Sequence, residues 1–225
     1  LKPDVLGIGI YIWNRSQSFE LIERLQKQNP NLKIVIGGPE VSFETETSIE
    51  CPVISGEGEK KWLEYLQIID QGGLPSEEVL NRWKTYGSDL PDLAPAYIEE
   101  DYPQLKNRIV YFETSRGCPY LCSFCLSALD KTVRYFDDEI VYDQIKKLID
   151  AGIQKFKFVD RTFNLKPGRM KALMEWLSQF EGPEFHFEVV GDILTPDILN
   201  FLETVPPGMF QFEIGIQTTD ETVQE

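Results

Sequence analysis

The sequence predicts an α/β protein in which two groups of parallel strands alternate with helices. Short, continuous apolar runs recur along the chain, and the stretches between them carry apolar residues at the spacing of an amphipathic helix. A stretch rich in Gly and Pro lies between the two groups. These residues interrupt regular patterns, so the stretch marks a boundary between them. We therefore expect a first domain over residues 1–73, a linker over residues 74–107 and a second domain over residues 108–225.

The first domain is expected to form a parallel sheet that helices cover on both faces. Its strand candidates are continuously apolar, which is typical of strands buried on both sides. The second candidate ends in Gly37-Gly38-Pro39, the punctuation of a tight turn. In chain order, the expected elements are a strand over 4–12, a helix over 19–28, strands over 32–36 and 52–55, and a helix over 59–70.

Four strands joined by helices are expected in the second domain. Asp137 and Asp138 begin one helix and Gly152 ends it, in keeping with the residues preferred at helix ends. Parallel strands with helical connections place functional groups at the carboxyl ends of the strands, as in the TIM barrel. The expected elements are strands over 110–114, 155–160, 184–190 and 210–216, with helices from 138, from 167 to 180 and from 195.

The composition is that of a globular chain with an acidic surface. The chain has 225 residues, 42% of them hydrophobic, and its 37 acidic and 22 basic residues give a formal net charge of −15. This charge repels phosphate backbones and anionic membrane surfaces, so neither a nucleic acid nor a membrane is an expected partner.

Three of the four cysteines lie close together, directly after the first strand of the second domain. Cys118, Cys122 and Cys125 have the spacing Cys-x3-Cys-x2-Cys. Three thiolates on one short loop can bind three irons of a [4Fe-4S] cluster, because sulfur is the soft ligand that such clusters use. The fourth iron would then be open to a substrate or cofactor, as an open position is at a catalytic zinc.

Other metal sites and disulfides fit the same cysteines less well. A structural zinc site needs four ligands, and the remaining candidates, Cys51 and His186, lie far away in the sequence. The common ferredoxin spacing differs from this one, and an odd trio in a chain without a signal peptide does not predict disulfides.

The cysteine spacing, with Phe124 directly before the last cysteine, resembles the radical S-adenosylmethionine (SAM) superfamily. The resemblance implies that SAM chelates the open iron, that one electron cleaves it to a 5'-deoxyadenosyl radical, and that the backbone of Phe124 lies near the adenine. In that superfamily a Gly-Gly-Glu-like segment after the second strand contacts SAM. Asp160 and Asn164 stand in this region instead, and capping of the next helix is their other interpretation.

The fourth strand of the second domain resembles the strand from which polar groups approach SAM in that superfamily. Its candidates are Glu213 and Gln217 in the run Phe-Glu-Ile-Gly-Ile-Gln. Side chains alternate along a strand, so these two residues share one polar face, which we expect to line the interior of a barrel.

The first domain resembles the C-terminal portion of a cobalamin-binding domain with flavodoxin-like topology. Such domains carry Asp-x-His-x-x-Gly, then Ser-x-Leu, then Gly-Gly. Gly9 and Tyr11 stand where Ser and Leu would be, and Gly37 and Gly38 follow at the matching interval. The resemblance implies that these three glycines belong to a cobalamin site whose first motif would precede residue 1. We expect cobalamin in the full-length protein rather than in this piece, and a tight turn is the other interpretation of the glycine pair.

Together, these resemblances imply a radical SAM enzyme of the cobalamin-binding family, truncated at both ends. The fold would be a partial flavodoxin-like parallel sheet followed by the first four βα units of a partial TIM-type barrel. Its substrate would be a small molecule, with methylation, cyclisation and rearrangement left open. Electrons would come from a reductant protein such as flavodoxin or ferredoxin, in the cytoplasm, because cluster thiolates need a reducing compartment. The alternative is a non-catalytic iron–sulfur or zinc-binding module that serves in electron transfer or as a scaffold.

Overall fold

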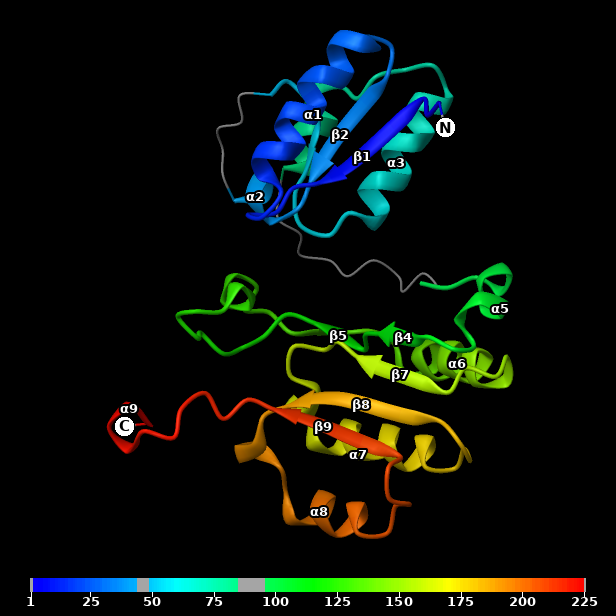
Figure 1. Cartoon of the computed structure of the whole chain (residues 1–225), viewed down its shortest axis with the longest axis vertical. Coiled ribbons are helices and arrows are strands. Elements are labelled where there is room, and N and C mark those ends of the chain that lie inside the picture. The colour runs from blue at the N-terminus through cyan, green and yellow to red at the C-terminus, as the bar shows by residue number, and fades with distance from the viewer. Residues whose placement is uncertain (1, 44–48, 85–95, 225) are drawn as a thin grey trace. The chain divides into compact units, whose positions relative to one another are not determined.

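The computed structural model describes residues 2–43, 49–84 and 96–224, which divide into two compact units (Figure 1). The first unit runs to Pro91 and the second begins at Asp92. Each unit is an α/β fold with a parallel sheet, so the expected class is confirmed at this level. Among the described helices, none combines the length and the apolar character needed to cross a membrane.

The sheet of the first unit has its strands in the order β1-β2-β3, and all of them are parallel. Ile36 of β2 lies in a buried cluster with Ile22 of the helix that follows β1, while Val35 points to the opposite cluster with Tyr65. Both faces of the sheet are therefore covered, as the continuous apolar strands predicted. The elements are β1 Val5–Gly9, α1 Arg15–Gln28, β2 Lys33–Gly37, α2 Pro39–Ser42, β3 Val53–Ile54, α3 Glu59–Asp70 and α4 Glu77–Trp83.

Helix α4 lies within the stretch that we expected to be a linker. Ser76 caps this helix by accepting a hydrogen bond from the amide of Val79 at 3.3 Å. Trp83 at its end is fully buried, and its indole nitrogen donates to Glu64 at 2.7 Å. This part of the stretch is thus packed onto the first unit, and the boundaries at residues 73 and 107 stay predictions.

The sheet of the second unit follows chain order, β4-β7-β8-β9, and every neighbouring pair is parallel. Its four strands coincide with the four expected from the sequence to within two residues at each end. A helix connects each successive pair. The elements are β4 Ile109–Phe112, β7 Lys155–Phe158, β8 Glu184–Val189 and β9 Phe210–Ile214, with α6 Asp138–Asp150, α7 Pro167–Leu177 and α8 Pro196–Leu202 between them, preceded by α5 Tyr102–Leu105 and followed by α9 Glu221–Gln224.

The two faces of this second sheet differ in chemistry. One face is a phenylalanine core, in which the rings of Phe158 and Phe187 stack at 4.7 Å and Phe201 of α8 contacts Phe210. The other face is polar or half-exposed, and Lys157 and Glu213 lie on it. Phe210 and Phe212 of the fourth strand thus lie on the aromatic face and Glu213 on the polar face, as the expected alternation requires, and Phe201 of α8 packs against the aromatic face.

Candidate functional site

The three cysteines lie on a loop whose two ends are tied together. β5, Ser115–Arg116, pairs antiparallel with β6, Arg134–Tyr135. The residues between them therefore form a loop that follows β4 and is closed at its base by this pairing. Gly117 begins this cysteine loop with a φ of 89°, and a Cβ there would lie 2.2 Å from the carbonyl oxygen of Thr132. Only glycine fits so close an approach, which fixes where the loop begins.

The three thiols of the cysteine loop differ in exposure. All are free; Cys118 is buried, with 7% of its surface exposed, whereas Cys122 and Cys125 are exposed. The amide of Cys118 donates to the carbonyl of Asp130 at 2.9 Å, and the amide of Cys125 donates to the carbonyl of Cys122 at 3.0 Å. The first thiol is thus fixed against the protein, and the other two are joined by a turn at the surface.

The donor chemistry of this loop fits an iron–sulfur cluster. Hydrogen bonds from Ser127 lower the pKa of the Cys125 thiol and so favour the thiolate that binds metal. In the part of the chain that the structure describes, no three His, Cys, Asp or Glu side chains are gathered closely enough to hold a metal ion. A cluster would therefore have to draw the exposed thiols and Cys118 toward one point.

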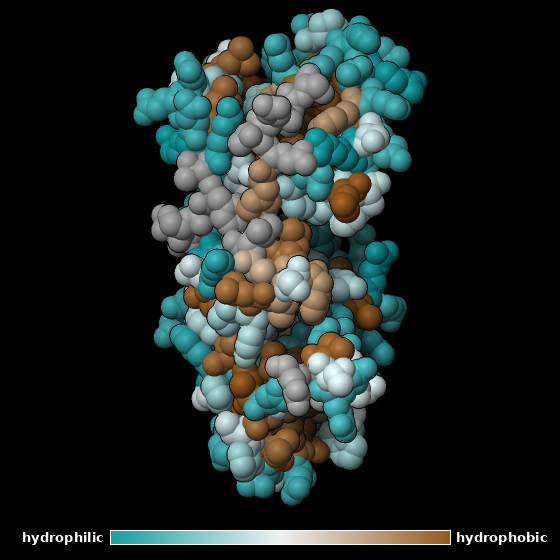
Figure 2. Space-filling view, turned by 90° about the vertical axis from the view of Figure 1, so that its left-hand side faces the viewer, coloured by the Kyte–Doolittle hydropathy of each residue, from teal (hydrophilic) through white to brown (hydrophobic). Residues whose placement is uncertain are grey.

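The tip of the cysteine loop is apolar and exposed. Phe124, directly before the last cysteine, is 74% exposed, and Leu121 and Leu126 on either side are 62% and 61% exposed. Apolar side chains also reach the surface elsewhere, as Figure 2 shows for one face of the molecule. The contact of Phe124 with SAM stays a prediction, and the exposed ring leaves this tip accessible to a ligand.

Asp160, at the end of β7, holds the chain where the cysteine loop begins. Its carboxylate is buried and accepts hydrogen bonds from the hydroxyls of Thr114 and Ser115 at 2.7 and 2.6 Å. It also accepts from the amide of Thr114, at 3.0 Å for Oδ2. Burial raises the pKa of Asp160, while these hydrogen bonds act in the opposite direction.

Arg169 of α7 joins the hydrogen bonds around Asp160 to the neighbouring helix and strand. Its guanidinium donates to the hydroxyl of Thr114 at 3.0 Å and pairs with Asp138 at 2.6 Å. It also lies over the ring of Tyr135 in β6, at 4.9 Å from the ring centre. Arg169 thus connects α6, α7 and both ends of the cysteine loop.

The segment between β7 and α7 reaches two further partners. The hydroxyl of Thr162 lies 3.7 Å from the sulfur of Cys118. Asn164 is fully buried, and its amide both donates to the carbonyl of Val190 at 2.7 Å and accepts from its N–H at 3.0 Å. Asn164 therefore extends the hydrogen bonding of β8 beyond the strand, and neither Asp160 nor Asn164 caps α7, whose preceding residue Lys166 makes no side-chain cap.

The two candidates of the fourth strand lie in different settings. Glu213 is 3.0 Å from the ammonium of Lys157 and 3.1 Å from Nε2 of His186. The hydrogen bond from Lys157 lowers the pKa of Glu213. Gln217 follows β9 with a φ of 66°, an uncommon backbone for a residue other than glycine, and its side chain lies over Gly215.

The carboxyl edge of the first sheet is built from glycines whose backbones approach closely. A Cβ on Gly38, which has a φ of 98°, would lie 2.5 Å from the carbonyl oxygen of Ile10. A Cβ on Gly37 would lie 3.0 Å from the carbonyl oxygen of Ile54, and one on Gly9 would lie 3.1 Å from the ring of Tyr11. Packing of the strand ends is thus sufficient to require glycine at residue 38.

Two aromatic rings stand exposed on the loop after β1 at this same edge. Tyr11 and Trp13 stack with ring centres 4.8 Å apart and 9° between their planes, and they are 39% and 72% exposed. Asn14 fixes the loop, because its side chain accepts from the amide of Tyr11 at 2.8 Å and donates to the carbonyl of Gly9 at 3.0 Å. An ordered, exposed aromatic pair at this edge is suited to contact a flat ligand.

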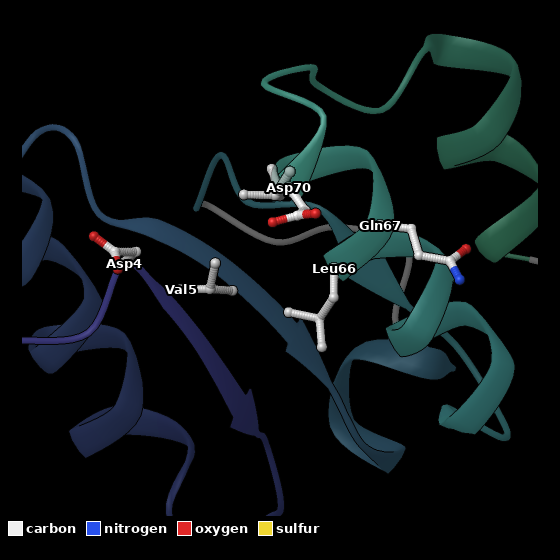
Figure 3. A pocket seen from close by; sticks show the side chains of 6 residues that line it. Asp4, Val5, Leu66, Gln67 and Asp70 are labelled. Atoms are coloured by element: carbon white, nitrogen blue, oxygen red, sulfur yellow. The ribbon is translucent and has the colours of Figure 1, made fainter.

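A pocket of about 550 Å³ lies at the opposite, amino-terminal end of β1 (Figure 3). Val5 of β1 and Asp4 just before it line the pocket on one side, and Leu66 and Asp70 line it from α3. Ligands of open α/β sheets bind at the carboxyl ends of the strands, so this pocket is not at the expected place for chemistry.

Comparison with known proteins places the second unit in context. The family model described as the radical SAM superfamily matches residues 112–225, just over half of the chain. The cobalamin-dependent radical SAM methyltransferase TokK of Streptomyces tokunonensis is 28% identical over 195 residues, which cover 74% of this chain and 28% of that protein. The 2-(S-pantetheinyl)-carbapenam-3-carboxylate methyltransferase of Streptantibioticus cattleyicolor is 26% identical, over 73% of this chain and 28% of its own length.

A solved structure shares the fold of nearly the whole chain. The radical SAM methyltransferase TsrM of Kitasatospora setae, solved with tryptophan and a SAM analogue, superposes with a TM-score of 0.67 at 16% identity. The match covers 99% of this chain and 50% of TsrM. The chain thus spans about a quarter of the curated methyltransferases and half of this structure.

Proposed function

The chain belongs to the radical SAM superfamily, and on this premise we propose that Cys118, Cys122 and Cys125 bind a [4Fe-4S] cluster whose fourth iron takes SAM. The observation that carries the proposal is the trio of free thiols on a loop closed by β5 and β6. Three thiolates leave one iron of a cubane cluster without a protein ligand. When bound, the cluster supplies the single electron that cleaves SAM and starts radical chemistry.

The residues around the cysteine loop have distinct roles in this proposal. Cys118 is the fixed ligand at the base, while the exposed thiols of Cys122 and Cys125 close on the cluster from the surface. The backbone of Phe124 would lie near the adenine of SAM, and its exposed ring would shield that side of the site from water. Gln217, which follows β9, offers its amide to the polar part of SAM.

Glu213 belongs to the polar face of the sheet in this proposal. We assign it, with Lys157, to the interior of a partial TIM-type barrel of which β4, β7, β8 and β9 are the first four strands. There the ion pair orients SAM or a small-molecule substrate. Asp160 and Asn164 are buried and bonded to neighbouring strand ends, so we give them no direct contact with SAM.

The first unit, we propose, is part of a flavodoxin-like domain that binds cobalamin in the full-length protein. The support is the glycine edge of Gly9, Gly37 and Gly38 together with the exposed pair of Tyr11 and Trp13. When bound, cobalamin supplies a carrier for a methyl group, and methylation of a small molecule is the reaction class that the curated relatives favour. The electron donor would be a small reductant protein of the flavodoxin or ferredoxin kind in the cytoplasm.

Iron and sulfide analysis of anaerobically reconstituted protein tests the cluster. We expect about four irons and four sulfides per chain in the wild type, in keeping with one cubane cluster. Cys122→Ala should lose most of this iron, whereas Cys51→Ala, which removes the only other cysteine, should retain it. Equal iron in both variants, or zinc in place of iron, would contradict the proposal and favour a metal-binding module of another kind.

A further inference from the structure

We propose that Asp160 is a positioning residue for the cysteine loop. By bonding Thr114 and Ser115, Asp160 holds Cys118 in its buried place. The inference rests on the proposed function, because the loop matters for the cluster that it would bind. It gives Asp160 a task other than contact with SAM.

The hydrogen bonds of Asp160 are concentrated on two consecutive residues. Oδ1 accepts from both hydroxyls, at 2.7 Å from Thr114 and 2.6 Å from Ser115, and Oδ2 accepts from the amide of Thr114 at 3.0 Å. All three residues are nearly inaccessible, with 1% of Asp160, 1% of Thr114 and 5% of Ser115 exposed. Buried hydroxyls without an acceptor are costly, so the carboxylate keeps this corner of the chain in one conformation.

The position of this corner sets the position of Cys118. Ser115 is the first residue of β5, and only Arg116 and Gly117 separate it from the cysteine. The segment that carries Asp160 also contacts Cys118 directly, because the hydroxyl of Thr162 lies 3.7 Å from its sulfur. This segment therefore holds Cys118 in two ways, through the corner at Thr114 and Ser115 and through the hydroxyl of Thr162, whereas Cys122 and Cys125 are exposed.

Replacing Asp160 should consequently expose one thiol selectively. Asp160→Ala removes every acceptor from the two hydroxyls. Asp160→Asn keeps one acceptor oxygen. If this oxygen faces the two hydroxyls, the amide NH2 faces the N–H of Thr114. If the oxygen faces that N–H, the amide NH2 faces the hydroxyls. A graded effect, with the Asn variant between the wild type and the Ala variant, is the signature of this network.

The test is the alkylation rate of each cysteine in the metal-free, reduced chain, with iodoacetamide as the probe and peptide mass spectrometry as the readout. In the wild type we expect Cys118 to react at least about tenfold more slowly than Cys122, because burial protects thiols from reagents. Asp160→Ala should bring the two rates within about threefold of each other, with Cys122 unchanged and Asp160→Asn intermediate.

Ile198→Ala is the matched control, because Ile198 is a buried residue of α8 that contributes to the core of the same unit. Its loss lowers stability without touching the network, so the ratio of the two rates should stay that of the wild type. An unchanged ratio in both folded Asp160 variants, or the same rise in Ile198→Ala, would overturn the proposal. Because Asp160→Asn removes the least, it decides the matter if the Ala variant fails to fold by circular dichroism.

Iron uptake by the same variants separates this proposal from the proposed function. If Cys118 is released in Asp160→Ala but even the wild type takes up no iron, the positioning role stands and the cluster assignment fails. If the wild type binds a full cluster while Cys118 reacts as fast as Cys122 without metal, the cluster assignment stands and the positioning role fails.

Discussion

The carboxyl edges of the two parallel sheets are built by different means. In the first unit these ends are shaped by the backbone, since Gly38 lets the chain pass close to Ile10, and the exposed side chains there include the rings of Tyr11 and Trp13. In the second unit the edge is shaped by buried polar side chains around Asp160. The carboxyl ends of the first sheet thus present exposed aromatic rings, whereas those of the second sheet hold the start of the loop that carries the three free cysteines.

We expect the largest change in the free energy of unfolding at Gly117, where a close backbone approach begins the cysteine loop. Gly117 and Gly208 share a φ of 89°, but a Cβ at Gly117 would lie 2.2 Å from a carbonyl oxygen, whereas nothing lies within 4 Å at Gly208. Gly208→Ala should cost only the backbone strain of about 1–2 kcal/mol, and Gly117→Ala at least about 3 kcal/mol. Chemical denaturation measures both, and equal losses would show that the loop start adapts freely.

Gly38→Ala is the corresponding change in the first unit. Its Cβ would lie 2.5 Å from the carbonyl oxygen of Ile10, so we expect a loss of about 2–4 kcal/mol in the free energy of unfolding. The transition of the second unit should not shift. Hydrogen exchange resolved by peptide would measure both units, and faster exchange in β4 or β7 would contradict the separation of the two edges.

The polar edge should respond to pH in the sense opposite to that of an ordinary aspartate. Burial raises the folded pKa of Asp160, so the folded state binds the proton more tightly than the unfolded state. The stability of the wild type relative to Asp160→Asn should therefore fall as pH rises from the ordinary aspartate pKa, about 3.9, through the raised folded value. Denaturation midpoints measured from pH 4 upward check the sign, and a difference that grows with pH in favour of the wild type would refute it.

Trp13→Ala should have the smallest effect on stability. The ring is 72% exposed and its contact is the stack on Tyr11, so the free energy of unfolding should change by about 1 kcal/mol or less. Trp83→Ala is the contrast, because this ring is fully buried and its removal should cost about 3–5 kcal/mol. Thermal unfolding compares the two, and a large loss in Trp13→Ala would mean that the exposed pair supports the fold.

Periodicity in the sequence was sufficient to predict the strands of both sheets, because buried strands are short apolar runs. It missed helix α4 and the burial of Trp83, because glycines and prolines nearby obscured a seven-residue helix. The cysteine loop was recognisable from its spacing. The network of Asp160 was not, because Thr114 and Ser115 lie 46 and 45 residues away in the sequence and only the fold brings them together.

Local patterns also gave incomplete information on the glycine and strand candidates. The glycine pair at residues 37 and 38 was visible, but the sequence could not reveal that the backbone of Ile10 requires Gly38. Alternation placed Glu213 on the polar face, while its ion pair with Lys157 depends on the register between strands. The loop that carries Trp13 has a recognisable sequence signal in Asn14, since an Asn just before a helix often fixes the preceding loop.

In the proposed function, three thiolates hold a cluster with one iron open to SAM. Its most direct test is electron paramagnetic resonance of the anaerobically reconstituted, dithionite-reduced chain, recorded with and without SAM. We expect a [4Fe-4S] signal whose g values shift when SAM is added, and no such signal in Cys122→Ala. A cluster signal that SAM leaves unchanged, or one that persists without Cys122, would rule out an open iron held by these three cysteines.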